Sequence, residues 1–153
     1  MKPVVIGMNN PYSNDPRYAL YPHPQKSAGY RLYDMLRQAA YRENMMVSLV
    51  NYVDRFDRFN LVTGEEWNVK EAALGAQSLL GTLQDRKVVI CGKAVAKAFD
   101  LKQPDFSLQK KHQHGFDYWV IPHPSGLCRE YNDPFTVRRV GDLLLALYVG
   151  SST

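Results

Sequence analysis

Four short apolar runs constrain the fold of this chain more than any other feature. They lie at residues 3–8, 59–63, 87–92 and 118–122, and each is mainly hydrophobic, without a regular alternation of apolar and polar residues. This pattern is typical of strands that are buried on both faces, as in a parallel sheet covered by helices. We therefore expect an α/β fold, a three-layer α/β/α sandwich around four parallel strands, with residues 47–53 as a candidate fifth strand.

Helical segments separate the predicted strands. Apolar side chains recur at helical spacing within residues 27–42. A second helix is expected to begin at Asn68, with Glu71 three positions on as in a capping box, and a short third helix to cover residues 94–99. The last should begin at Asp133-Pro134, a capping side chain followed by a proline suited to the first turn. The chain has 153 residues, the usual size of one domain, so we expect a single domain spanning residues 1–153.

The net charge and the number of cysteines restrict the kinds of partner and metal site that we expect. Nineteen Lys and Arg against 15 Asp and Glu give a net charge of +4, which suits an anionic partner such as nucleic acid. Cys91 and Cys128 are too few for a four-thiolate metal site, so we expect two reduced thiols. The apolar run near the N-terminus is too short for a secretion signal, and no run approaches the ~20 residues of a membrane span. We expect a cytoplasmic protein without a membrane partner.

The first two loops after strands carry amides and aromatic rings. Ligands of open parallel sheets bind beyond the carboxyl ends of the strands. Asn9 and Asn10 stand there before Pro11, where a stiff backbone lets an amide position a water or a ring. Tyr21 lies farther along the same loop, either as a stacking platform for a base or packed on its own domain. Asn60 interrupts an apolar strand, so its amide either recognises a pyrimidine edge or ties two backbone segments together.

The third loop, around Lys93, has Gly-Lys after a strand but lacks the full phosphate-loop motif, and no dinucleotide fingerprint is present. We expect a plain turn there, whose helix start and lysine face solvent or a backbone phosphate of DNA.

The fourth loop combines five residue types suited to a nucleic-acid site. His123, between two prolines, can donate a hydrogen bond to an oxyanion. Ser125 can contact a phosphate, and Gly126 lets the backbone approach a ligand closely. Leu127 and Arg129 place an apolar wedge beside a cation, which suits insertion into a base stack. The alternative is a proline-rich turn whose leucine packs on the core.

Two of these segments, "VVIGMNNPYS" and "VIPHPSGLCR", resemble the two signature motifs of the uracil-DNA glycosylase superfamily. The second is most similar to that of the mismatch-specific uracil and thymine glycosylases, while its histidine is that of the general uracil-DNA glycosylases. Weaker resemblances, "YPHP", "NLVT" and "KVVICGKAV", lie between them. The resemblance implies a uracil-DNA glycosylase-like fold and a monomer. It also implies an enzyme that flips a uracil or modified pyrimidine out of DNA and hydrolyses its N-glycosidic bond without metal or cofactor.

The resemblance also assigns roles to the residues in and near the first motif. Asn10 would position or activate the water, with Asn9 as the alternative because the pair makes the motif one residue longer than usual. Tyr12 would block a substituent at the 5-position of the base, Tyr21 would stack on the flipped base, and Asn60 would recognise its edge.

In the second motif, the resemblance implies that His123 stabilises the negative charge on the departing base. Leu127 would fill the gap left in the duplex, with Ser125 and Arg129 on phosphates.

One departure from the family pattern affects the chemistry. The most active members have an aspartate where this chain has an asparagine, so we expect slower excision, unless the loop folds back to bring the carboxylate of Asp15 to the site. A catalytically weak or inactive DNA- or base-binding module is therefore the alternative function. An unrelated α/β domain that binds a small nucleotide is a third, against which the missing phosphate motifs count.

Overall fold

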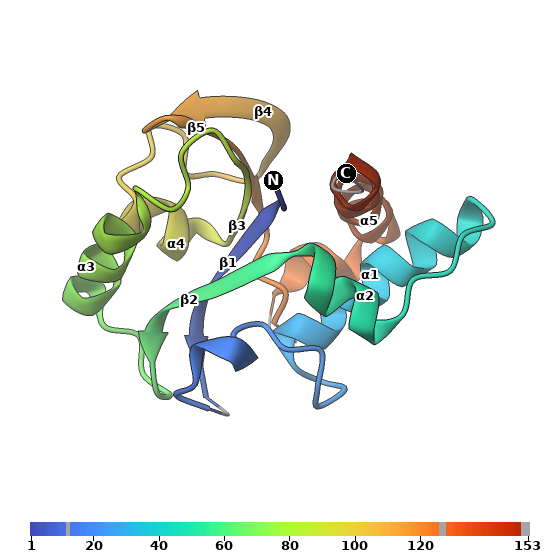
Figure 1. The fold of residues 1–153 in the computed structure, drawn as a ribbon, viewed down its shortest axis with the longest axis horizontal. Coiled ribbons are helices and arrows are strands. Elements are labelled where there is room, and N and C mark those ends of the chain that lie inside the picture. The colour runs from blue at the N-terminus through green and yellow to red at the C-terminus, as the bar shows by residue number, and fades with distance from the viewer. Residues whose placement is uncertain (12, 126–127, 151–153) are drawn as a thin grey trace.

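A five-stranded, mostly parallel sheet forms the centre of the protein (Figure 1). The computed structural model describes residues 1–11, 13–125 and 128–150. The strand order is β2-β1-β3-β5-β4, and all neighbours are parallel except β4 and β5. The strands are β1 (Val4–Asn10), β2 (Asp57–Thr63), β3 (Lys87–Cys91), β4 (Ser107–Gln113) and β5 (Phe116–Ile121).

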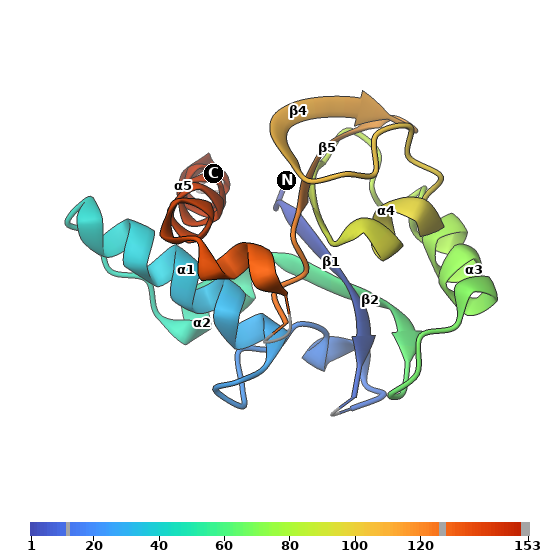
Figure 2. The ribbon, with the colours of Figure 1, turned by 180° about the vertical axis from the view of Figure 1, so that it is seen from behind.

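Helices cover both faces of this sheet, so the predicted three-layer α/β/α arrangement is confirmed (Figures 1 and 2). On one side, α1, α2 and α5 pack against alternate strand residues such as Val5 and Val89; on the other, α3 and α4 pack against Val4 and Val88. The helical elements are η1 (Pro16–Tyr18), α1 (Ala28–Arg42), α2 (Leu49–Arg55), α3 (Val69–Leu79), α4 (Lys93–Ala98), η2 (Arg129–Asn132) and α5 (Pro134–Gly150).

Two of the predicted helix starts, those of α1 and α3, are confirmed by their capping contacts, and the predicted third helix is α4, which begins at Lys93 without a side-chain cap. Ser27 Oγ accepts from the backbone N–H of Tyr30 at the start of α1. Asn68 Oδ1 accepts from the N–H of Glu71 at 2.9 Å, while the carboxylate of Glu71 accepts from the N–H of Thr63, 3.0 Å away. That second bond ties the start of α3 to the end of the edge strand β2, so the capped helix also fixes the carboxyl end of that strand.

The candidate fifth strand at residues 47–53 is wrong, because most of this segment belongs to helix α2. Ser48 Oγ accepts from the N–H of Asn51 at 3.1 Å and so caps the helix. Tyr52 is fully buried while Val50 is 67% exposed, which is the one-sided burial of a surface helix rather than that of a strand covered on both sides.

The true fifth strand is β4, an edge strand antiparallel to β5. Its sequence, SLQKKHQ, is polar because an edge strand needs no apolar cover on both faces, and lysines there discourage pairing with other chains. His114 and Gly115 join the two strands with φ values of 54° and 89°, the backbone of a tight two-residue hairpin turn.

Within the described ranges, none of the helices combines the length and the apolar character that crossing a bilayer requires.

Candidate functional site

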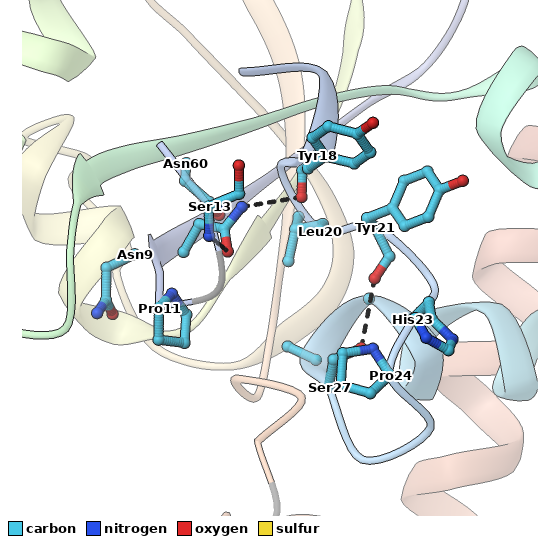
Figure 3. A pocket seen from close by; sticks show the side chains of 13 residues that line it. Asn9, Pro11, Ser13, Tyr18, Leu20, Tyr21, His23, Pro24, Ser27 and Asn60 are labelled. Carbon is cyan, nitrogen blue, oxygen red and sulfur yellow. Dashed lines mark hydrogen bonds between the residues drawn. The ribbon is translucent and has the colours of Figure 1, made fainter. Parts of the chain in front are cut away.

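A cavity of about 350 Å³ lies at the carboxyl ends of β1 and β2 (Figure 3). Its walls come from the two strand ends, from the loop after β1 and from the first turn of α1. Its lining residues are Asn9, Asn10, Pro11, Ser13, Tyr18, Leu20, Tyr21, His23, Pro24, Ser27, Ala28, Gly29 and Asn60. The structure thus brings together four of the predicted site residues: Asn9, Asn10, Tyr21 and Asn60.

Asn60 offers this cavity a hydrogen-bond acceptor. In the sheet it is the register partner of Gly7 on β1. Its Oδ1 is buried and accepts no hydrogen bond from any residue that the structure describes. A Cβ on residue 7 would lie 2.9 Å from this oxygen, so the glycine provides the space that the amide occupies. A buried acceptor without a partner is costly, and a ligand N–H that reached this oxygen would satisfy it.

Asn10, in contrast, has its amide bonded at both ends. Its Nδ2 donates to the carbonyl oxygen of Tyr18 at 2.9 Å, and its Oδ1 accepts from the backbone N–H of Ser13 at 3.2 Å. The side chain is buried and closes the loop after β1 on itself. The geometry therefore supports a role for Asn10 in loop structure.

Asn9 ties the end of β1 to the loop after β2. Its Nδ2 donates to the carbonyl oxygens of Gly64 at 2.7 Å and Glu65 at 2.9 Å. Within the described part of the chain, no group donates to its Oδ1. This oxygen is therefore the better placed of the two asparagine oxygens to hold a water.

Asp15 is engaged locally. Its carboxylate accepts from the backbone N–H of Arg17, at the start of η1, and forms an ion pair with the Arg17 guanidinium at 2.7 Å. The side-chain hydrogen bond from Arg17 lowers the pKa of Asp15. Asp15 does not line the main cavity, although it borders a smaller one beside it that also includes Asn10 and Asn60.

The backbone of residues 17–21 is held by side chains from four elements. Every carbonyl oxygen in this segment accepts a hydrogen bond from a side chain. The donors are Arg58 for residues 17 and 19, Asn10 for residue 18, Tyr52 for residue 20 and Ser27 for residue 21. Figure 3 shows two of these bonds, those to the carbonyls of residues 18 and 21. These five hydrogen bonds together fix the path of the segment.

Tyr18 and Tyr21, which this segment carries, form an aromatic pair at the cavity wall. Their ring centres lie 5.1 Å apart at 75°, an edge-to-face contact, and the two residues are 44% and 36% exposed. The guanidinium carbon of Arg58 lies 5.8 Å from the centre of the Tyr21 ring. An exposed ring held in this way can stack on a planar ligand.

The first turn of α1 closes the opposite wall. The backbone of Leu20 and Tyr21 rests directly on Gly29: a Cβ there would lie 2.2 Å from the Leu20 oxygen and 2.3 Å from the Tyr21 oxygen. Ala28 and Gly29 line the cavity, and the N–H groups of a first helical turn have no acceptor within the helix. The positive end of α1 therefore favours negative charge in the cavity.

His123 is not among the residues that line this cavity, and it lies beside the start of α4 instead. A Cβ on Gly92 would lie 3.1 Å from the Cβ of His123, and Gly92 has a φ of 97° that favours glycine. Burial lowers the pKa of His123, so its ring is neutral at pH 7. The hydroxyl of Tyr131 donates to the carbonyl of Pro122 at 2.6 Å and fixes the base of this loop. The N–H of Ser125 donates to the carbonyl of His123 at 2.8 Å.

The remaining predicted DNA-contacting residues divide into two groups. Lys93 begins α4 and forms an exposed ion pair with Asp105 at 3.1 Å. Arg129 begins η2 and is exposed. Tyr12, Gly126 and Leu127 lie outside the described residues.

Neither cysteine is placed for nucleophilic chemistry. Both are free; Cys91 is buried and Cys128 half-buried. Burial is the main cause that raises the pKa of each thiol, so both are protonated at neutral pH. Among the described residues, no group of three or more His, Cys, Asp and Glu side chains is arranged to hold a metal ion.

Three contributors to the site were missed at the sequence level: Ser27, Gly29 and Arg58. Ser27 was predicted only as a helix start. Gly29 and Arg58 belong to no sequence motif, because their roles depend on where the loop of residues 17–21 packs.

Comparison of the sequence with models of known protein families and with curated proteins finds no match.

Proposed function

We propose that the protein is a monofunctional pyrimidine DNA glycosylase of the uracil-DNA glycosylase type, acting in base excision and DNA repair. The observation that carries the proposal is the buried oxygen of Asn60, which has no hydrogen-bond partner among the described residues, on a residue that lines a cavity together with the exposed Tyr21. The two motifs that resemble those of this superfamily end in the loops after β1 and β5.

The size and the polarity of the cavity suit a flipped pyrimidine. At interior packing density a uracil ring takes up about 120 Å³, and the cavity holds about 350 Å³. The N3–H of uracil or thymine donates to Asn60 Oδ1, and the ring stacks on Tyr21. Cytosine has a lone pair at N3 in place of this hydrogen, so the unmet acceptor favours bases with an N3–H.

The reaction breaks the bond between C1′ of the deoxyribose and N1 of the base. Water adds hydroxide to C1′, the base departs as an anion, and the released proton ends on the base. In this proposal Asn9 holds the water through its Oδ1, because both ends of the Asn10 amide are already bonded. An amide orients water but does not remove its proton, so the chemical step is slower than with a carboxylate.

Two groups stabilise the departing base. The positive end of α1 lies in the cavity wall and favours its anionic form. His123 follows β5, which lies two strands away from β1 in the sheet. At ordinary strand spacing the ends of these two strands are about 10 Å apart. A nucleotide bound across these strand ends brings its base within reach of the neutral ring, which donates one N–H. Arg129 and Lys93 contribute phosphate contacts, with Ser125.

Strand cleavage at abasic sites tests the proposal. Duplexes that carry uracil, thymine opposite guanine, or 5-hydroxymethyluracil are incubated with the protein and then treated with alkali. Loss of one oxyanion donor costs about 100-fold in rate, so His123→Ala should be slowed by that factor, while exposed His112→Ala on β4 should not. Asn60→Ala should lose about 10- to 100-fold, and the exposed control Asn51→Ala none. If wild type, His123→Ala and Asn60→Ala produced strand breaks at equal rates, the proposed function would be wrong.

A base-binding module without excision is the second candidate. It is favoured by one observation: no carboxylate is among the described residues that line the main cavity. This function predicts DNA binding that weakens with salt and produces no strand breaks on any of the three substrates.

A further inference from the structure

Arg58 is the side chain that contributes most to holding the loop of residues 17–21. It lies on β2, two residues before Asn60, so the two side chains project from the same face of the strand. Its Nη1 donates to the carbonyl of Ala19 at 2.9 Å and its Nη2 to the carbonyl of Arg17 at 3.4 Å. One planar guanidinium therefore holds two of the five carbonyls in the segment that carries Tyr18 and Tyr21.

The surroundings of this guanidinium are unusual for a half-buried cation. None of the ion pairs among the described residues includes Arg58. Its Nε is buried and has no hydrogen-bond partner within the described ranges. Two carbonyl dipoles and the face of the Tyr21 ring, 5.8 Å away, are what offsets its desolvation. The charge is thus coupled to the position of the ring.

We propose that Arg58 is a positioning residue for the Tyr21 platform, an inference that rests on the proposed role of the cavity in holding a planar base. Through the carbonyls of residues 17 and 19 it fixes the backbone that carries the ring, and through its charge it fixes the ring itself. The platform is then ordered before the base arrives, and base binding does not have to supply that order.

The proposal makes a specific kinetic prediction. Tyr21 contacts the base equally in the bound substrate and in the transition state, so a displaced ring weakens binding more than it slows the chemical step. Arg58→Met keeps an apolar side chain as far as the position of Nε and removes the guanidinium with its donors and charge. We expect the half-saturating DNA concentration in single-turnover excision to rise about tenfold, and the maximal rate to change less than threefold. Arg58→Lys retains the charge and supplies a single ammonium group as donor in place of the planar guanidinium, and it should recover part of the affinity.

Arg55→Met is the matched control. The Arg55 guanidinium lies 4.6 Å from the centre of the Tyr148 ring, so this change also removes an arginine–tyrosine contact, but one at the end of α2 away from the cavity lining. It controls for a general loss of stability and should leave the half-saturating concentration unchanged.

A second measurement needs no DNA. In protein labelled with ¹³C at the tyrosine ring carbons, the Tyr21 resonance is assigned from its absence in Tyr21→Phe. We expect Arg58→Met to shift or broaden this resonance, and Arg55→Met to leave it in place. If Arg58→Met leaves it unchanged, or if binding and maximal rate fall together by the same factor, the positioning role is wrong. If wild type neither cleaves nor binds any of the three duplexes, the proposed function fails, while the tyrosine spectrum still decides whether Arg58 positions the ring.

Discussion

Gly29→Ala should destabilise the protein although alanine is the better helix former. The added Cβ would lie 2.2 Å from the Leu20 oxygen and 2.3 Å from the Tyr21 oxygen, so the loop and α1 must separate by about 1 Å to reach ordinary contact. Neither side yields easily, because Tyr52 and Ser27 bond the two loop carbonyls. Overpacking costs about 1–3 kcal/mol and occasionally more, and alanine recovers at most about 1 kcal/mol of helix propensity. We expect a net loss of about 2 kcal/mol.

Urea unfolding followed by circular dichroism measures this loss. With a slope of about 2 kcal/mol per molar urea, the midpoint should fall by about 1 M. Gly81→Ala is the control, since a Cβ there meets no atom of the described residues within 4 Å, and its urea midpoint should stay level or rise slightly. If Gly29→Ala were as stable as wild type, the loop of residues 17–21 would not rest on α1, and the two would not form the wall of the cavity together.

Three further predictions concern the loops around His123 and the two thiols. Burial lowers the pKa of His123, so on acidification the unfolded chain takes up a proton at this residue first, below about pH 6.5. The free energy of unfolding should therefore fall as the pH drops below that value, and it should fall less in His123→Asn. Gly92→Ala strains a φ of 97° and crowds His123, and should slow excision about tenfold or more, measured in single turnover. Iodoacetamide at pH 7.5 should label Cys128 slowly and Cys91 only after unfolding, as mass spectrometry of the digest would report.

The fold was largely predictable because the central strands are buried on both faces. That burial demands apolar runs, and the central strands β1, β3 and β5 have them. The edge strand β2 is only partly buried, but its second half is also mainly apolar. The segment at residues 47–53 shows the limit of this signal, since a short apolar run has the same composition in a half-buried helix. The edge strand β4 has no such run, although the turn at His114-Gly115 was a local hint of a hairpin.

The candidate site was predictable only where a residue type indicates chemistry. Asn9 and Asn10 end β1, Tyr21 lies in the loop after it, and Asn60 lies within the neighbouring β2; all four line one cavity. The roles of Arg58 and Gly29 were not predictable, because an arginine in a strand and a glycine in a helix can each serve many structural purposes. Which carbonyl Arg58 bonds depends on the path of a loop about 40 residues away in sequence.

The identity of the released product tests the central claim most directly. A duplex with a single deoxyuridine is incubated with the protein in excess, and the small molecules are identified by liquid chromatography and mass spectrometry. The proposed reaction predicts free uracil in amounts equal to the abasic sites, with less of both in Asn60→Ala. Release of a nucleoside or nucleotide, or binding of the duplex with no product at all, would contradict it.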